Sequence, residues 1–420
     1  MPVQVLWHGV LDYPSGIIMS RQPMETVYIT RSVRIPDPVR ISRYRRAPEL
    51  GPKILFFSGG TALNDVSRVL KNYTHNSIHL VTPFDSGGSS AKLRKAFAMP
   101  SIGDLRSRLI ALADETVTGH PEIYNLFTYR FPDKARKGQL LDHLESMIRG
   151  RHPLVDPVLN PMRRIIRNQL GYFYDAMPVK FDLRGASIGN LILTGGYLNN
   201  HEHLDPIIFL FEKLVGVQGI VRAVVNDNYH LTAELKNGNR IIGQHLLTGK
   251  EVDPLTSAVD RLSVSKRLDK YIPVKPQLRK KNHKLIQQAE LICYPPGSFY
   301  SSMIANLLPQ GVAASIAAND CPKVYIPNLG SDPEQVGMTL NDSLQKLMTY
   351  LKDDVPKSCT PESLLNFVLL DKRNGSYPSK LSAKLVRELN IQVIDVPLIS
   401  KRSAPFYDSK MLVSALLSLT

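Results

Sequence analysis

The sequence predicts an α/β protein, a Rossmann-like three-layer sandwich in which helices cover both faces of a mostly parallel sheet. Short apolar runs rich in β-forming residues alternate with segments whose apolar residues recur every three to four positions. This alternation is typical of βαβ units, which build parallel sheets with helical crossovers. Several of the apolar runs end at paired glycines, which favour a turn from a strand into a helix. A helical insertion and a small β-hairpin flap complete the predicted architecture.

The first predicted unit is the strand KILFFS at 53–58, followed by Gly59-Gly60 and a helix at 61–73. Apolar residues of that helix recur at helical spacing. The next strand, SIHLVTPF, leads to a second glycine pair, and the amphipathic stretch DLRSRLIALAD predicts a helix. Later strands of the same sheet are predicted within four ranges: 289–294, 322–330, 364–373 and 389–399.

The domain organisation follows from changes in this pattern. Residues 1–50 are predicted to be an irregular basic extension, in which ETVYITRSVRI (25–35) favours an edge strand. Residues 51–420 are predicted to form one α/β domain. Within that domain, residues 130–180 predict a helical insertion or lid, because two stretches with basic faces flank a proline-bounded connection.

Residues 220–250 predict the hairpin flap. HLTAEL and RIIGQHL flank KNGN, and Asn237-Gly238 is a pair that tight hairpin turns favour. The polar and basic residues 253–283 that follow are predicted to be a loop.

The composition favours a globular protein without a membrane span. Hydrophobic residues make up 43% and charged residues 21% of the 420 residues, which is ordinary for a chain with a large core. No run of about 18 apolar residues occurs, and the start lacks the regions of a signal peptide, so we expect a cytoplasmic protein. Cys293, Cys321 and Cys359 lie far apart, which predicts reduced thiols rather than a disulfide or a zinc site.

The net charge of +15 permits anionic partners. Basic residues crowd the stretches 31–46 and 266–284, but neither stretch is interleaved with the aromatic residues of a nucleic-acid stacking platform. The charge alone does not choose among nucleic acid, a membrane surface and a phosphorylated small molecule, but the lack of such aromatic residues disfavours nucleic acid.

The turn at Gly59, Gly60 and Thr61 is suited to holding a phosphate. Glycine lets the backbone come close to the anion, and the helix that follows adds free N–H groups and its dipole. The pattern is neither GxGxxG nor GxxxxGK[ST], so it supports neither a dinucleotide fingerprint nor a P-loop. The alternative is a tight turn between a strand and a helix.

The second loop, FDSGGSS, brings a carboxylate, glycines and hydroxyls together. Gly87, Gly88 and Ser89 offer donors to an anion, with Lys92 and Arg94 following. Asp85 would repel a phosphate, and so it is expected to bind Mg²⁺ or to accept a proton. Asp104 begins a helix, where it is expected either to cap the helix or to support Asp85. Arg106 and Arg108 follow on that helix and could reach a phosphate, although a solvent-exposed position is the default expectation for Arg108.

The loop YPPGSFYSS predicts a second anion cradle, in which Gly297, Ser298 and Ser301 open a helix after a proline pair. A rigid turn with capping serines is the alternative. Asn190 and Asn328 end apolar runs, where they either support turns or contact a base or sugar.

Together these loops resemble one family. GGTxL, DxGGSSxxLR, GDLRxxLxALAD, GNLxL, PPGSFYSSxxxNLLPxG and KVYIPNL stand in the order seen in the 2-phospho-L-lactate transferase (CofD-like) superfamily. The sequence is most similar to its gluconeogenesis-factor (YvcK-type) branch, over about residues 53–345. This resemblance implies a Rossmann-like fold, a nucleotide diphosphate at the glycine loops and a homodimer.

The two branches imply different activities. In the transferase branch, a lactyl-phosphate group moves from a guanosine diphosphate derivative to a deazaflavin hydroxyl with Mg²⁺. In the other branch, uridine-diphosphate sugars bind, and the protein regulates carbon flux or cell-wall supply. By motif position, the resemblance assigns catalysis to Asp85 and Asp104, with Asp85 also as the metal ligand. It assigns ligand binding to Gly59, Gly60, Thr61, Gly87, Gly88, Ser89, Asn190, Gly297, Ser298, Ser301 and Asn328.

The sequence departs from the family's pattern at Ser86, where a second aspartate is usual, and at Ala62, where a glycine is usual. The loss of one hard oxygen ligand favours a sensor that binds a nucleotide sugar without turnover. The retained Asp85 and Asp104 favour a transferase of phosphorus-containing groups. Both interpretations stay open, with transferase-like ancestry preferred, and a basic scaffold is a weaker third.

Overall fold

The computed structural model describes residues 32–116, 119–249, 251–330 and 332–420. The chain divides into the units Met1–Val33 and Arg34–Thr420, and the fold presented here is that of the second unit. The predicted edge strand at 25–35 lies largely outside the described residues. Among the helices of the described residues, none combines the length and the apolar composition that a bilayer crossing requires.

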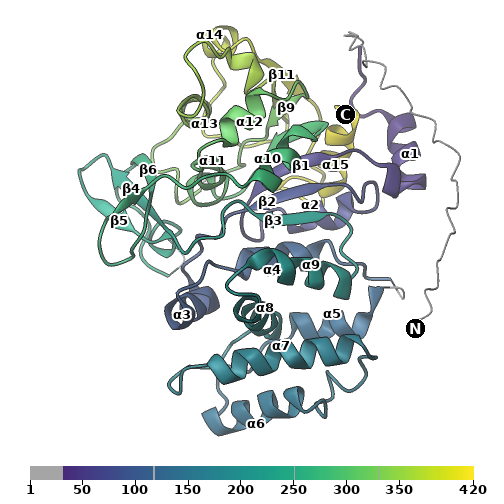
Figure 1. Cartoon of the computed structure of the whole chain (residues 1–420). Coiled ribbons are helices and arrows are strands. Elements are labelled where there is room, and N and C mark those ends of the chain that lie inside the picture. The colour runs from purple at the N-terminus through teal and green to yellow at the C-terminus, as the bar shows by residue number, and fades with distance from the viewer. Residues whose placement is uncertain (1–31, 117–118, 250, 331) are drawn as a thin grey trace, which may run out of the picture. The chain divides into compact units, whose positions relative to one another are not determined.

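A seven-stranded parallel sheet forms the centre of this unit, as predicted (Figure 1). Its order is β11-β10-β9-β8-β1-β2-β3, and every neighbouring pair is parallel. The predicted strands are all present, and β3 is an addition. The strands are β1 (Ile54–Ser58), β2 (Ile78–Val81), β3 (Ile220–Ala223), β8 (Leu291–Tyr294), β9 (Lys323–Tyr325), β10 (Phe367–Leu370) and β11 (Gln392–Asp395).

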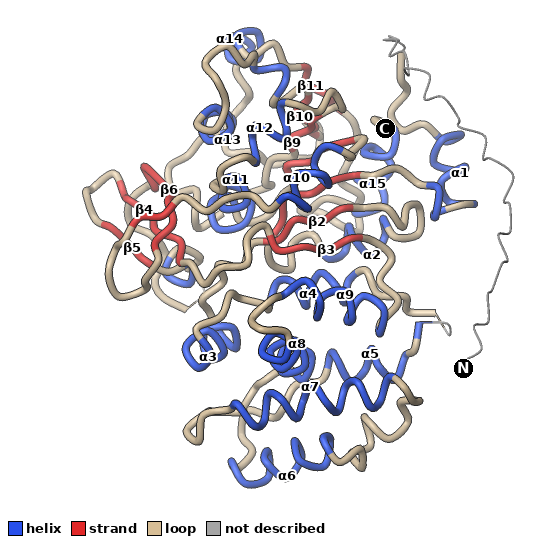
Figure 2. Tube along the Cα trace, in the orientation of Figure 1, coloured by secondary structure: helices blue, strands red, loops and turns tan. Residues whose placement is uncertain are grey.

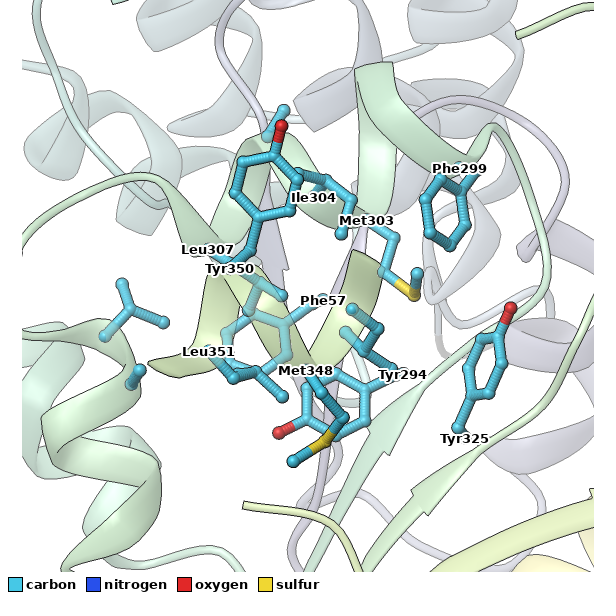
Figure 3. Packing of buried hydrophobic residues seen from close by; sticks show 14 of the residues in the cluster. Phe57, Tyr294, Phe299, Met303, Ile304, Leu307, Tyr325, Met348, Tyr350 and Leu351 are labelled. Atoms are coloured by element: carbon cyan, nitrogen blue, oxygen red, sulfur yellow. The ribbon is translucent and has the colours of Figure 1, made fainter. Parts of the chain in front are cut away.

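Successive side chains of β1 point to opposite faces of the sheet, and helices cover both faces. Ile54 and Phe56 pack with α2 (Asn64–Leu70) and α15 (Ser409–Ser418) on one face. Phe57 points to the other face, where its ring stacks on Tyr294 with centroids 5.8 Å apart (Figure 3). A strand that is buried on both faces has a continuous apolar sequence, as KILFFS does. Helices on this second side are α10 (Lys280–Gln287), α11 (Ala305–Leu307), α12 (Val312–Ala317), α13 (Leu340–Lys352) and α14 (Ala383–Glu388).

A helical part lies between β2 and β3 in the chain and is larger than the predicted insertion at 130–180. The predicted basic-faced helices are present as α6 and α7, but the stretch SIGNLILTGGYL also forms a helix, α8. Because α8 is apolar all round, it is buried along almost its whole length. The helices of this part are α3 (Gly88–Phe97), α4 (Gly103–Ala111), α5 (Pro121–Thr128), α6 (Lys137–Ile148), α7 (Met162–Ala176), α8 (Ile188–Asn199) and α9 (Leu204–Leu214).

The hairpin is confirmed as part of a four-stranded antiparallel sheet of order β5-β4-β6-β7 (Figure 2). Gly238 takes the positive φ that its turn requires. The prediction of a loop at 253–283 is wrong, because that stretch forms β6, β7 and the start of α10. Charged residues inside β6 interrupt its apolar pattern in the sequence, although its buried residues pack where β6 pairs with β4. These strands are β4 (His230–Leu235), β5 (Arg240–Ile242), β6 (Val259–Ser265) and β7 (Pro273–Val274).

The main unit begins at Arg34 and has a helix before residue 51. The helix α1 (Pro38–Arg46) is capped by Asp37, whose Oδ1 accepts from the backbone amide of Arg40 at 3.0 Å. Ile41 and Tyr44 pack against the core that includes α15. The sequence predicts an irregular segment here. Its prolines and arginines obscure the pattern of this short amphipathic helix.

Candidate functional site

The candidate site lies where the direction of the sheet changes. From β1 the chain proceeds to β2 and β3 on one side, whereas β8 leads to β9, β10 and β11 on the other. Loops that follow such neighbouring strands diverge and leave a crevice at the carboxyl ends of the strands. A cavity of about 390 Å³ is present there. It is lined by Gly60, Thr61, Asp85, Gly87, Gly88, Ser89, Ser90, Gly103, Asp104, Arg106, Ser107, Arg130, Asn190, Gln244, His245, Thr248, Glu251, Ser298 and Ser302.

The first glycine turn is held from behind by Arg108, which is fully buried. Its Nη2 donates to the carbonyl oxygens of Gly59 and Gly60 at 3.2 and 3.3 Å. Because the C=O and N–H of a trans peptide point in opposite directions, the amides of Gly60 and Thr61 point away from Arg108. Within the described part of the chain, neither amide donates to another protein group. The turn therefore presents N–H groups at the cavity wall.

Sequence reasoning placed Arg108 at the surface, and this is wrong. Its Nη1 donates to Ser67 Oγ at 2.6 Å, so the buried guanidinium links the helix α2 to the glycine turn. Burial lowers the pKa of Arg108 to about 10, which still leaves it cationic at neutral pH. A cation beneath the turn adds a favourable field for an anion above it.

The second glycine loop is held by Arg94 in the same way. The Nη1 atom of Arg94 donates to the carbonyl oxygens of Phe84 and Asp85 at 3.0 and 3.1 Å. Asp85 in turn accepts from the amide of Gly87 at 3.1 Å, so it stabilises its own loop while lining the cavity. The predicted convergence of Lys92 and Arg94 on a ligand is not observed, since Lys92 pairs with Asp182 at 3.0 Å.

Two cations line the cavity, Arg106 and Arg130. Arg106 was among the groups predicted to reach a phosphate, whereas Arg130 was not. Burial, followed by the neighbouring Arg130 charge, lowers the pKa of Arg106 to about 10, while Asp104 opposes this shift. The buried Nε of Arg106 has no hydrogen-bond partner among the described residues. A Cβ on Gly189 would stand 2.9 Å from Arg106 Cδ, so the glycine of IGN makes room for this side chain.

Asn190 follows that glycine and lies in the cavity wall, although only 1% of it is exposed. Its Nδ2 donates to Ser89 Oγ at 3.4 Å, which joins α8 to the second glycine loop. Its Oδ1 has no hydrogen-bond partner among the described residues. A buried amide oxygen of this kind is suited to a donor on a ligand or to an ordered water.

The third loop does not form the second anion cradle that was expected. The amide of Phe299 donates to Asp332 Oδ2 at 2.9 Å, and those of Tyr300 and Ser301 donate to Glu334 Oε2 at 2.8 Å. Carboxylates of the chain thus occupy the first N–H groups of the π-helical turn at 299–304. Burial and the neighbouring Asp332 charge raise the pKa of Glu334 to about 7.

Ser301 and Asn328 consequently lie outside the cavity lining. The Ser301 hydroxyl donates to Glu334, and Asn328 makes reciprocal 2.7 Å hydrogen bonds with the backbone of Gly297. Gly59 and Gly297 line a smaller adjacent cavity of about 120 Å³. Ala62 fits there, since its Cβ would lie 3.4 Å from a Cβ on Gly297.

The remaining predicted residues do come together around the cavity: Gly60, Thr61, Asp85, Gly87, Gly88, Ser89, Asp104, Asn190 and Ser298. Within the described ranges, no group of three or more His, Cys, Asp or Glu side chains is arranged to hold a metal ion. Asp85, Asp104 and Glu251 are the carboxylates of the cavity lining that could contribute oxygen ligands to a metal ion.

The family follows from comparison with known proteins. The family model described as 2-phospho-L-lactate transferase CofD matches residues 54–399. The chain belongs to the CofD family. This CofD-family protein is 26% identical over 313 residues to the gluconeogenesis factor of Bacillus subtilis, covering 71% of this chain and 75% of that one. It is 26% identical over 353 residues to the gluconeogenesis factor of Listeria monocytogenes, covering 82% and 88%.

A gluconeogenesis-factor relative from Nostoc sp. is 29% identical to the CofD-family protein over 330 residues, which are 78% of this chain. The chain spans 57% of the length of that relative. The fold also matches the crystal structure of a UPF0052-family protein from Bacillus halodurans, with a TM-score of 0.63 and 22% identity, over 87% of this chain and 99% of that one. The resemblance of the glycine motifs to this family is thereby confirmed.

Proposed function

We propose that this cavity binds a ligand containing a nucleoside diphosphate. The observation that carries the proposal is the meeting of the outward amides of Gly60 and Thr61 with the guanidinium groups of Arg106 and Arg130. Backbone amides and guanidinium groups are the donors that proteins use most effectively for phosphate oxygens. The volume of about 390 Å³ lies within the range of small-molecule sites.

The carboxylates give the ligand site a second character. Asp85 and Asp104 share the cavity with the cationic groups, which suits a Mg²⁺–diphosphate better than a bare phosphate. Bound Mg²⁺ would supply neutralisation of the phosphate charge. The names of the gluconeogenesis-factor relatives support a regulatory role. In that role, as the family resemblance implies, a nucleotide sugar would be bound without turnover.

Transfer of a phospho-ester group to an acceptor hydroxyl is the second candidate function, and the description of the family model favours it. In that reaction Asp85 would accept the proton of the attacking hydroxyl, while the glycine amides and Arg106 would hold the leaving nucleotide. Positioning and charge neutralisation supply most of the rate in phosphoryl transfer, so few protein groups are needed.

A thermal-shift screen with UDP, UDP-sugars, GDP and Mg²⁺ tests the proposal. A nucleoside diphosphate at about 100 times its Kd should stabilise the chain by roughly 2.7 kcal/mol. Arg106→Gln should weaken that binding by about tenfold, because it removes a charge-assisted hydrogen bond. Arg149→Gln is the matched control, since Arg149 is exposed just after α6 and pairs with Glu145. If no nucleotide stabilises the wild-type chain, the proposal fails.

The two candidate functions are separated by Asp85→Asn. If the protein is a transferase, the variant should retain nucleotide binding but lose product formation, as followed by phosphorus NMR with an acceptor alcohol. If it is a sensor, neither protein forms product. The homodimer implied by the family resemblance is part of the proposal, and sedimentation analysis of the full chain tests it.

A further inference from the structure

Ser86 and His245 form a hydrogen-bonded pair that joins the second glycine loop to the antiparallel sheet. Ser86 Oγ lies 2.8 Å from His245 Nδ1 and accepts from the backbone amide of His245 at 3.2 Å. The amide of Ser86 donates to Gln244 Oε1 at 3.4 Å. These contacts cross 159 positions of sequence and fix the turn Gln244–Leu246 against the loop.

The two partners have different positions relative to the cavity. His245 lines it, together with Gln244 and Thr248, whereas Ser86 does not and is only 7% exposed. Gly243 has a φ of +118°, and a Cβ there would stand 2.8 Å from His245 Cε1. Gly243 and Ser86 therefore position the imidazole together. Ser86 does so from outside the cavity lining.

The hydrogen bond between Ser86 Oγ and His245 Nδ1 is compatible with either neutral tautomer of the ring. In one of them the Ser86 hydroxyl, which accepts from the His245 amide, donates its own proton to Nδ1. A neutral imidazole that accepts at Nδ1 carries its proton on Nε2. Within the described ranges, no hydrogen bond from Nε2 to another protein group is found.

We propose that His245 donates a hydrogen bond from Nε2 to a phosphoryl oxygen of the bound diphosphate, and that Ser86 is the positioning residue for the imidazole. The inference rests on the proposed function, since it assigns a further donor to the same ligand. The glycine turns come from the parallel sheet and Arg106, Arg130 and Asn190 from the helical part, so His245, with Gln244 and Thr248, makes the connection that follows β5 the third contributor.

Calorimetric titration of the full chain with inorganic pyrophosphate tests the proposal without any assumption about the base. In His245→Gln the side-chain amide nitrogen stands near the place of Nε2, whereas in His245→Asn it stands near Nδ1. We expect His245→Asn to weaken pyrophosphate binding about tenfold and His245→Gln to stay within about threefold of wild type. If His245 only tethers the loop, the order is reversed, because Asn retains the contact with Ser86.

The role of Ser86 is tested by Ser86→Ala and the double variant with His245→Asn. We expect Ser86→Ala to weaken binding about threefold, and the double variant to bind no more weakly than His245→Asn alone, since Ser86 acts through the imidazole. Additive losses, or wild-type affinity in His245→Asn, would overturn the inference. The proposed function still holds after such a result if the wild-type chain binds pyrophosphate and Arg106→Gln weakens that binding. If wild-type chain binds neither pyrophosphate nor UDP, both proposals fail.

Discussion

Arg94 and Arg108 show how single residues shape the candidate site without lining it. Each guanidinium is buried, and each donates to two successive carbonyl oxygens of a glycine loop. Burial lowers the pKa of both to about 10, so each remains charged near neutral pH. Buried cations of this kind need partners for their donors, and the loop carbonyls supply two of them for each guanidinium. The loops are thereby held in one conformation before any ligand binds.

Glu251 is a residue that competes with an anionic ligand. Its Oε1 accepts from the amide of Gly88 at 2.7 Å, at the start of α3. Glu251→Gln should therefore raise the affinity for pyrophosphate about fivefold, equivalent to about 1 kcal/mol, because it removes a negative charge beside the phosphate. Calorimetry measures this directly. Glu388→Gln, on an exposed ion pair of α14, should leave the affinity unchanged, and a fall in affinity in Glu251→Gln would contradict the assignment.

Two buried histidines should make stability depend on pH. Burial lowers the pKa of His79 well below its ordinary value, and burial followed by the Arg94 charge lowers that of His230 to about 4. A histidine whose folded pKa is depressed is stabilising above the unfolded value near 6.5, and this contribution is lost as the pH falls toward the folded value. Between pH 6.5 and 4.5, the free energy of unfolding should fall by about 1 kcal/mol per pH unit through His230, and the effect of His79 has the same sign.

Urea unfolding of wild type and His230→Gln across this range isolates the effect of one histidine. The destabilisation caused by the variant should shrink as the pH falls, because the wild-type histidine loses its advantage. A difference that is constant with pH would show that His230 titrates normally in the fold.

At the scale of elements, α8 organises the helical part and delivers Asn190 to the cavity. It lies against α7 and α9, and its paired glycines permit this closeness. A Cβ on Gly195 would stand 1.8 Å from the carbonyl oxygen of Gln169 on α7, and one on Gly196 would stand 2.1 Å from Ile207 on α9. Sequence reasoning predicted α6 and α7 from their amphipathic pattern, but a uniformly apolar stretch has no such pattern.

Gly195→Ala should destabilise the fold by about 3 kcal/mol, because the added methyl group forces two helix backbones apart. Gly171→Ala on α7 is the matched control, since nothing lies within 4 Å of its added methyl group. That variant should be more stable than wild type by roughly 0.5 to 1 kcal/mol, because alanine is the better helix former. Urea unfolding at neutral pH measures both. Equal effects of the two substitutions would contradict the close packing of α7 and α8.

At the scale of the main unit, the cavity is shared by three parts of the fold. The parallel sheet supplies the glycine turns, the helical part supplies Arg106, Arg130 and Asn190, and the antiparallel sheet is followed by the turn that carries His245. A ligand that contacts all three parts couples their stabilities, because it binds only when they are together.

Hydrogen exchange with and without UDP tests this coupling. Protection should increase in peptides covering 59–63, 87–91, 188–192 and 243–248, and stay unchanged at the distant helix α6. Segments that open locally gain protection when a ligand stabilises the closed form. Protection confined to the first two peptides would show that the ligand rests on the parallel sheet alone.

The sequence by itself determined the parallel sheet, the glycine turns after β1 and β2, the hairpin and the basic-faced helices. These features depend on periodicity and turn residues that lie within a few positions of one another. It also identified Asp85, Asp104 and the glycines of the first two loops as residues of one site, since parallel strands end on the same edge.

Only the tertiary structure decided which other side chains enter the cavity and which leave it. Arg130 and His245 are brought in, whereas Ser301 turns to Glu334 and Asn328 supports Gly297. Ser86 and His245 are 159 positions apart, and Arg108 and Gly59 are 49 apart. Such pairs leave no periodic trace in the sequence, because their choice depends on how the helical part and the antiparallel sheet pack beside the strands.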